Sequence, residues 1–250
     1  MNDEHMNDEH TNGEPGAAQL HELQSRIAAA ATDNGRARDD VQLLLATKTV
    51  STDRIAQALR AGFTLIGENR VQELTAKAEA LRAIPHTTHL IGHLQRNKMA
   101  AALPLIDCLQ TLDSTELAER LHRRLAETNR DQPPAGRDPG SPRSLDVMIQ
   151  VNVSAEPTKA GVPPERTAEL VDAVGGLPEL RLIGLMTIGL NSADIDAVRG
   201  GYSQLRELRD RLIPGGHLSM GMSGDFEAAI AEGATIVRIG SGAFGARPQS

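Results

Sequence analysis

Residues 41–51 read VQLLLATKTVS, an apolar run that ends in a lysine, Lys48, between two threonines. A short run of this kind, rich in Val and Leu and lacking polar alternation, is typical of a parallel strand buried on both faces. A lysine at the mouth of such a strand is costly unless something there uses it. The stretch therefore predicts a buried strand whose end carries a functional group.

The same pattern recurs along the chain, with amphipathic segments such as STDRIAQALRAG (51–62) between the runs. The further apolar runs are 63–67, 88–92, 106–111, 146–153, 180–186, 217–222 and 235–240. Eight strands, each followed by a helix, predict an α/β fold, a single (β/α)₈ TIM barrel with an extra N-terminal helix over about 17–34. The rival interpretation of the same alternation is an open, doubly wound sheet.

Two segments depart from this pattern. Residues 1–16 begin with the repeat MNDEHMNDEH and are polar and acidic, which predicts a disordered tail. Residues 130–144 (RDQPPAGRDPGSPRS) are rich in Pro, Gly and Ser and predict a flexible surface loop. Because the strand and helix pattern resumes after that loop, we expect residues 17–250 to form one barrel domain.

The composition of the chain argues against nucleic-acid binding and against a membrane span. The net charge is −7, but the acidic tail accounts for most of the surplus, so the remainder is nearly neutral. With one Tyr, three Phe and no Trp, the chain offers few platforms for base stacking, and we expect no nucleic-acid partner. No apolar run approaches the length of a membrane span. The single cysteine, Cys108, favours a reducing compartment, and we expect a cytoplasmic protein.

The polar residues gather directly after the predicted strands. In a barrel, such positions meet at one face, where active sites sit, and the loops after the last two strands favour phosphate. This clustering is the reason to prefer the barrel to the open sheet. The residues are Lys48, ENR (68–70), HLQRNK (93–98), Ser223, Gly240 and Ser241.

The last two strands lead into glycine- and serine-rich segments, SMGMSGDF (219–226) and RIGSGAFG (238–245). Backbone N–H groups and serine hydroxyls in such turns can hold a phosphate. Desolvation of Lys48 at a barrel mouth would favour the neutral amine that a Schiff base requires. An aldehyde that also carries a phosphate, such as pyridoxal 5′-phosphate (PLP), fits both features. Two alternatives remain: Lys48 reaches out to solvent, or it contacts the anion of another phosphorylated metabolite.

Six motifs together resemble the PLP homeostasis protein family (YggS/PROSC-like), whose fold is similar to the alanine racemase barrel. They are LLLATKTVS, GFTLIGENRVQE, HLIGHLQRNK, LDVMIQVNVSAEPTKAGV, LRLIGLMTIG and LSMGMSGDFEAAIAEGATIVRIGSGAFGAR, running from about residue 20 to residue 247. The resemblance implies a Schiff base between PLP and Lys48, with Asn69 beside the cofactor and Arg238 facing its pyridine nitrogen. It also implies phosphate contacts from Ser223, Gly240 and Ser241, together with the backbone of Met222.

Other candidate residues have simpler explanations. His86, His89 and His93 alternate along one strand with no Cys or carboxylate cluster beside them, so we expect no metal site. Cys108 and Met186 suit the core. The rim lysines Lys98 and Lys159 could bind an anion or a second PLP, but solvated charges are the default.

A carrier and an enzyme remain as functional hypotheses. Racemisation needs a base on each face of the cofactor, and the only tyrosine, Tyr202, is expected on a helix away from the strand ends. Arg238 would donate to an unprotonated pyridine nitrogen and weaken the electron sink, unless it pairs with a nearby carboxylate instead. We therefore expect a monomeric PLP carrier that serves PLP-dependent apoenzymes, with a racemase-like enzyme as the alternative.

Overall fold

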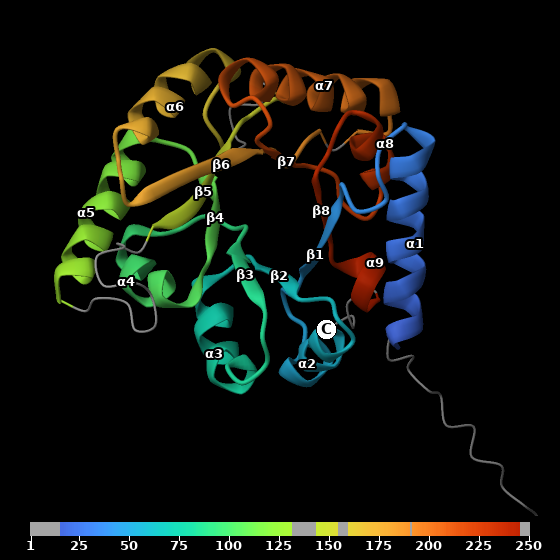
Figure 1. The fold of residues 1–250 in the computed structure, drawn as a ribbon, viewed down its shortest axis with the longest axis horizontal. Coiled ribbons are helices and arrows are strands. Elements are labelled where there is room, and N and C mark those ends of the chain that lie inside the picture. Colours follow the sequence, from blue (N-terminus) through green and yellow to red (C-terminus); the bar gives the residue numbers. More distant parts are fainter. Residues whose placement is uncertain (1–15, 132–143, 155–159, 191, 246–250) are drawn as a thin grey trace, which may run out of the picture.

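The computed structural model describes residues 16–131, 144–154, 160–190 and 192–245. The acidic tail, except Gly16, and most of the predicted loop at 130–144 lie outside these residues, as does Lys159. Within the described residues the strands form a closed parallel barrel in the order β1 to β8 (Figure 1). The strands are β1 (Gln42–Ala46), β2 (Leu65–Glu68), β3 (Thr87–Leu90), β4 (Cys108–Leu112), β5 (Leu145–Gln150), β6 (Leu180–Met186), β7 (His217–Ser219) and β8 (Ile236–Ile239).

Pairing between the first and last strands closes the barrel. Gln42 lies opposite Ile236 and Leu45 opposite Ile239, in parallel register. The barrel prediction is therefore confirmed, and the open-sheet interpretation is wrong because an open sheet would leave both of these edges unpaired. Each of the eight predicted apolar runs overlaps one strand, with boundaries that differ by a few residues.

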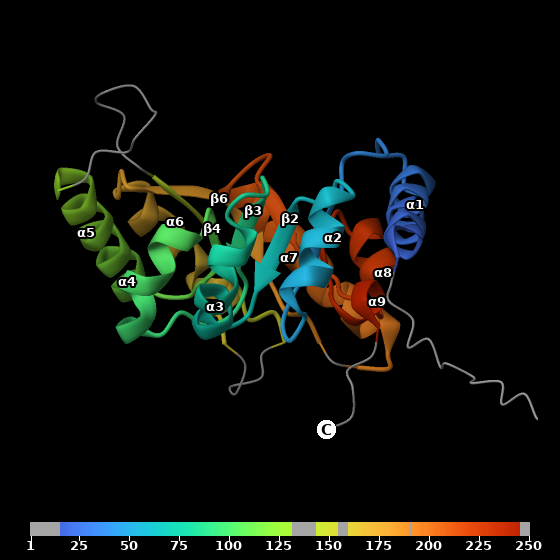
Figure 2. The ribbon, with the colours of Figure 1, turned by 90° about the horizontal axis from the view of Figure 1, so that it is seen from below.

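Helices surround the barrel (Figures 1 and 2). They are α1 (Ala17–Asp33), α2 (Thr52–Arg60), α3 (Val71–Leu81), α4 (Met99–Ala102), α5 (Thr115–Asp131), α6 (Thr167–Gly175), α7 (Ile195–Leu212), α8 (Phe226–Ala231) and α9 (Ser241–Phe244). Short 3₁₀ turns occur at Arg96–Lys98, Leu103–Leu105 and Pro164–Arg166. In the described residues no helix is both long and apolar enough to cross a membrane.

Side chains alternate between the barrel interior and the layer beneath the helices. On β8, Ile236 belongs to the interior cluster, whereas Val237 and Ile239 pack in the outer cluster under the helices. Cys108 is fully buried in the interior cluster, which confirms it as a core residue. Because both faces of each strand are covered, the strands are nearly continuous apolar runs in the sequence.

Strand β7 ends earlier than its apolar run predicts, at Ser219 instead of residue 222. Met220 and Gly221 still hydrogen-bond to Ile236 and Arg238 of β8, and the chain turns at Gly221, whose φ is +89°. A Cβ at this position would lie 2.5 Å from the Cβ of Ala229, so the turn also requires close packing against α8. The turn places residues 222–225 over the mouth of the barrel.

Helix α1 packs beside α8 and α9, as the two ribbon views agree (Figures 1 and 2). Arg26 pairs with Glu227 of α8, and its guanidinium carbon lies 4.9 Å from the ring centroid of Phe226. Gln19 Nε2 donates to the carbonyl of Gly242, 3.1 Å away. The predicted N-terminal helix therefore supports the segments that follow β7 and β8.

Candidate functional site

A cavity of about 480 Å³ opens at the carboxyl ends of the strands, within the size range of small-molecule sites. Its wall is built largely from the segments that follow β1, β2, β7 and β8. Every residue that the family resemblance implies for the cofactor lines it: Lys48, Asn69, Met222, Ser223, Arg238, Gly240 and Ser241.

Lys48 lies in the turn that follows β1 and is half-buried. Lys48 lines the cavity, and its amine has no hydrogen-bond or ion-pair partner among the described residues. The next residue, Thr49, has a φ of +63°, a left-handed conformation that β-branched residues rarely adopt. Such strain persists only where the surroundings enforce it, and it is common at functional sites. The structure thus holds the lysine on a strained turn with its amine free to react.

The segments after β7 and β8 meet at two serines. Ser241 Oγ lies 3.3 Å from Ser223 Oγ, which in turn accepts a hydrogen bond of 3.2 Å from the N–H of Gly242. A Cβ on Gly242 would lie 3.3 Å from Ser223 Oγ, so glycine permits this approach. The backbone N–H groups of Ser223, Gly224 and Ser241 have no partner in the described part of the chain. Unpaired N–H groups beside two hydroxyls form a donor set suited to a phosphate.

Met222 and Tyr202 differ from expectation. The N–H of Met222 donates to Asp225 Oδ1 at 2.6 Å, so this group is already used, and Met222 lines the cavity without offering its amide. The Tyr202 hydroxyl donates to the other oxygen of Asp225 at 2.8 Å. The prediction that Tyr202 lies away from the strand ends is therefore wrong, because α7 brings its ring under the turn after β7. Burial raises the pKa of Tyr202 above its ordinary value, and its ring does not line the cavity.

Arg238 points into the barrel from β8 and is 6% exposed. Its Nη1 donates to Ser219 Oγ at 2.8 Å and its Nη2 to the carbonyl of Thr187 at 2.7 Å. Burial lowers the pKa of Arg238 to about 10, so the guanidinium remains charged at neutral pH. No carboxylate of the described residues pairs with Arg238, so the interpretation as a strand-end ion pair is wrong.

A buried polar chain extends from Arg238 across the barrel. Ser219 Oγ donates to Gln110 Oε1 at 2.7 Å, and Gln110 Nε2 lies 2.7 Å from His89 Nδ1. Burial lowers the pKa of His89 to about 4, so the ring is neutral at pH 7 and its Nδ1 accepts from the amide. The chain satisfies polar atoms that would otherwise be unpaired in the core.

The lining of the cavity carries a net positive charge. Lys48, Arg54 and Arg238 line it, and the described lining residues include no Asp, Glu or His. Such a lining favours an anionic ligand and offers no carboxylate or imidazole as a proton acceptor.

Arg54, on α2, is a lining residue that the sequence did not indicate. Its Nη2 donates to the carbonyl of Phe244 at 2.7 Å, and its buried Nε has no hydrogen-bond partner in the described structure. In the sequence it resembles any charged residue of an amphipathic helix, so no local signal distinguishes it. Met186, expected only to fill the core, also lines the cavity beside Ile91.

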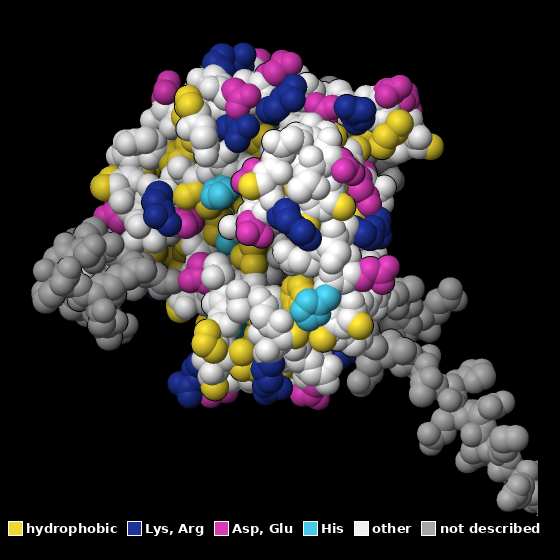
Figure 3. All heavy atoms as spheres, turned by 45° about the vertical axis from the view of Figure 1, so that its right-hand side comes forward, with side chains coloured by type: hydrophobic (Ala, Val, Ile, Leu, Met, Phe, Trp, Pro, Cys, Tyr) yellow, Lys and Arg dark blue, Asp and Glu magenta, His cyan; other side chains and the backbone are white. Residues whose placement is uncertain are grey.

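The remaining candidates lie elsewhere. His93 is exposed, and neither it nor Lys98 lines the cavity. In the described residues no group of three His, Cys, Asp or Glu side chains is arranged to hold a metal ion. On the face shown in Figure 3, acidic and basic side chains are interspersed.

Comparison with known proteins gives a consistent result. Residues 20–248 match the family model described as alanine racemase, N-terminal domain. The chain is 40% identical to the pyridoxal phosphate homeostasis protein of Aquifex aeolicus (strain VF5), over 92% of this chain and 97% of that protein.

Two solved structures are similar over nearly their whole length. A protein from Bifidobacterium adolescentis described as unknown has a TM-score of 0.83 and 37% identity, with 97% of this chain and 98% of that one covered. PipY of Synechococcus elongatus PCC7942, solved with PLP bound, has a TM-score of 0.76 and 32% identity, with 92% and 99% covered.

Proposed function

Because this chain belongs to the pyridoxal phosphate homeostasis family, we propose that it holds PLP in the cavity at the barrel mouth and takes part in PLP homeostasis. The observation that carries the proposal is the pairing of an unpartnered lysine amine with a phosphate-type donor set across one positive cavity. A ligand that bonds covalently to the amine and is held by the donor set would carry a carbonyl and a phosphate. PLP has both groups, and the PipY relative was solved with PLP bound.

The residues fit the cofactor. Lys48 would hold the aldehyde carbon covalently through Nζ, and Ser223, Ser241 and the nearby N–H groups would bind the phosphate. Gly240 and Gly242 let the backbone come close, and Asn69 would lie beside the ring. Arg238 would donate to the pyridine nitrogen, since Ser219 and Thr187 hold its guanidinium at the cavity. When bound, PLP supplies a conjugated ring that can withdraw electrons from an attached amine.

The same residues favour a carrier over an enzyme with committed turnover. Arg238 keeps its own proton, so it cannot protonate the pyridine nitrogen as a carboxylic acid would. The described cavity wall holds no carboxylate or imidazole to take a proton from a bound amine. The Tyr202 hydroxyl does not line the cavity and is hydrogen-bonded to Asp225. The match to the alanine racemase domain supports a racemase-like enzyme as a second candidate.

We further propose that the protein acts as a monomer and gives up PLP to PLP-dependent apoenzymes. The cavity is open at the strand ends and is complete within one chain, so neither loading nor release requires a second subunit.

The proposal is tested by reducing the PLP-loaded protein with borohydride and mapping the modified peptide. The expected adduct is on Lys48, with loss of the visible absorbance band, and Lys48→Ala should load no covalent PLP. An adduct confined to Lys98 or Lys159 would overturn the assignment of Lys48. Lys98→Ala serves as the matched control and should load normally.

A further inference from the structure

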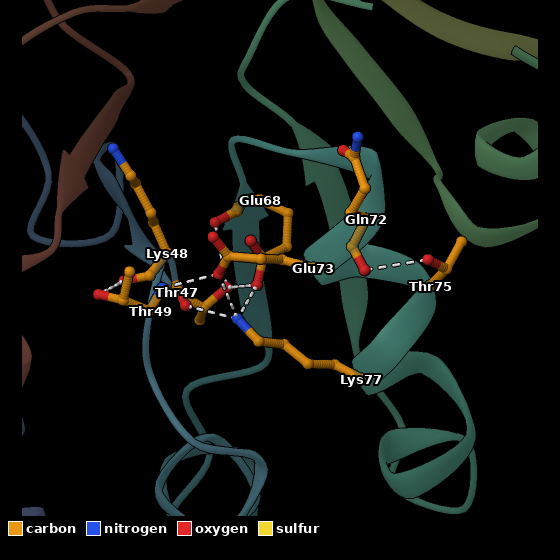
Figure 4. A network of polar contacts seen from close by, with 9 residues as sticks. Thr47, Lys48, Thr49, Glu68, Gln72, Glu73, Thr75 and Lys77 are labelled. Atoms are coloured by element: carbon orange, nitrogen blue, oxygen red, sulfur yellow. Dashed lines mark hydrogen bonds and ion pairs between the residues drawn. The ribbon is translucent and has the colours of Figure 1, made fainter. Parts of the chain in front are cut away.

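We propose that Lys77, which does not line the PLP cavity, is a positioning residue that holds the turn carrying Lys48 and so sets the direction of the Lys48 amine. The proposal rests on the proposed function of Lys48 as the PLP-binding residue. It assigns a role to a partly buried cluster behind the cavity, formed by Thr47, Glu68, Glu73 and Lys77 (Figure 4).

Lys77 donates from α3 to three acceptors at once. Its Nζ lies 2.8 Å from the carbonyl of Thr47, 2.6 Å from Glu68 Oε1 and 3.0 Å from Glu73 Oε2. An ammonium group has three N–H bonds, so these acceptors use all of them. One of the three is the backbone of the residue that immediately precedes Lys48.

Glu73 holds the residue that follows Lys48. Its Oε2, which accepts from Lys77, also accepts from the N–H of Thr49 at 2.7 Å. The peptide units on both sides of Lys48 are thus fixed by one ion pair on α3. Thr47 is held a second time, because its hydroxyl donates to Glu68 Oε1 at 2.6 Å.

The conformation that the cluster enforces is unfavourable on its own. Thr49 has a φ of +63°, which a β-branched residue does not adopt without support. The turn has one internal tie, the N–H of Val50 donating to the carbonyl of Thr47 at 3.0 Å. The hydrogen bond from Thr49 to Glu73 adds a second tie from outside the turn, and we expect Lys48 to shift when that tie is lost.

The cluster acts through the backbone and not on the ligand. Figure 4 shows the Lys48 side chain extending away from Lys77, on the other side of the Thr47–Thr49 turn. None of Glu68, Glu73 or Lys77 lines the Lys48 cavity. Their effect on PLP would therefore pass through the turn that carries Lys48 and Thr49, both of which line the cavity.

Stability alone does not account for the cluster. The Glu68 side chain is 2% exposed and that of Lys77 12% exposed, so both charges are largely removed from water. A buried pair often contributes less than an apolar pair of similar volume would. Glu68 Oε2 also lacks a hydrogen-bond partner in the described structure, which adds to the cost. What the pair supplies, and an apolar pair could not, is directed hydrogen bonds to the turn.

The test compares PLP with pyridoxine 5′-phosphate, which has an alcohol in place of the aldehyde and cannot bond covalently to Lys48. In Lys77→Met, we expect the affinity for PLP to fall about tenfold or more, because misplacing a reacting group has a large effect. The affinity for pyridoxine 5′-phosphate should change by less than about twofold, because the phosphate donors are untouched. General loosening of the fold would lower the affinity for both ligands alike.

Two further variants keep the test decisive. Arg82→Met removes a charge just after α3 that, among the described residues, pairs only with the exposed Glu79, and this variant should bind both ligands as the wild type does. If Lys77→Met does not fold, the double variant Lys77→Met, Glu68→Gln removes the buried pair together and should show the same selective loss.

The outcomes separate this inference from the proposed function. If the wild type binds PLP no better than pyridoxine 5′-phosphate, the proposed role of Lys48 is wrong. If the wild type prefers PLP and the Lys77 variants keep that preference in full, or lose affinity for both ligands equally, Lys77 is not a positioning residue.

Discussion

The hydroxyl oxygens of Ser223 and Ser241 lie 3.3 Å apart, although 18 positions separate the two residues in the chain. They come from adjacent strands, since β7 and β8 pair in the barrel and each serine follows the end of its strand. Neither segment alone would make an anion site. Together they place two hydroxyl donors on one ligand position, which is the basis of the first prediction.

Replacing Ser223 or Ser241 by Ala should weaken PLP binding by about 1.5–3 kcal/mol each, because each change removes one charge-assisted hydrogen bond to the phosphate. Calorimetric or fluorescence titration with PLP measures the effect. Ser25→Ala, on the exposed face of α1, should bind PLP normally. Pyridoxal, which lacks the phosphate, should bind the wild type poorly, and equal affinity for pyridoxal and PLP would contradict the phosphate site.

The protein should exchange the Cα proton of alanine slowly, at well below about 1 s⁻¹, the lower end of the usual enzyme range. The reason is that the described cavity wall has no carboxylate or imidazole, while a positioned acid–base group contributes roughly 10²–10⁴-fold. NMR in D₂O at high protein concentration follows the exchange. Exchange at an enzyme's rate would favour the racemase-like alternative, whereas slow exchange that disappears in Lys48→Ala fits a carrier.

Stability should fall between pH 6.5 and pH 4 in part because of His89. Burial lowers the pKa of His89 from 6.5 to about 4, so the unfolded chain binds the proton more readily over this interval. The contribution of neutral His89 to the free energy of unfolding is fully present above pH 6.5 and is lost as the pH falls through 4. It amounts to roughly 2–3 kcal/mol.

Urea unfolding across this pH range measures the effect in the wild type and in His89→Asn, whose amide oxygen can still accept from Gln110. The variant should have a shallower dependence of unfolding free energy on pH. Identical slopes in the two proteins would show that His89 does not contribute.

Gly221→Ala should destabilise the fold by about 1–3 kcal/mol, because the new methyl group meets Ala229 and the backbone φ is +89°. Gly35→Ala is the matched control, with a φ of +70° and no atom within 4 Å of the added Cβ. It should cost only the free energy of placing an alanine at a positive φ. Adding Ala229→Gly to Gly221→Ala should recover part of the steric cost, because the Cα of Phe226 stays 3.1 Å from the added Cβ. Thermal unfolding compares these variants, and equal effects of the two Gly→Ala changes would argue against the close contact.

The sequence predicts the barrel and the cavity wall because both depend on strand order. Buried parallel strands are apolar on both faces, and their carboxyl ends must meet at one end of a closed barrel. The positions of Lys48, Ser223 and Ser241 therefore follow from counting strands.

The contacts of helix side chains could not be predicted in this way. Tyr202, Arg54 and Lys77 all lie on amphipathic helices, where the pattern indicates which face is buried but not what the polar atoms at its edge contact. Tyr202 reaches Asp225 only because α7 packs beside α8, and Lys77 reaches Thr47 only because α3 lies against the turn after β1. These contacts depend on helix packing, which a single sequence does not specify.

Helix α1 rests on the segments that follow β7 and β8, and β1 is paired with β8. A ribosome makes α1 and β1 about 190 residues before their partners α8 and β8. While the chain is being synthesised, the first helix has no surface to pack on and the first strand has one free edge. Ser223 and Ser241, which form the proposed phosphate site, come together only after residue 241 has emerged from the ribosome. Retention of PLP would therefore require synthesis through β8 and Ser241, and a nascent chain that stalls before β8 would be unable to sequester the cofactor.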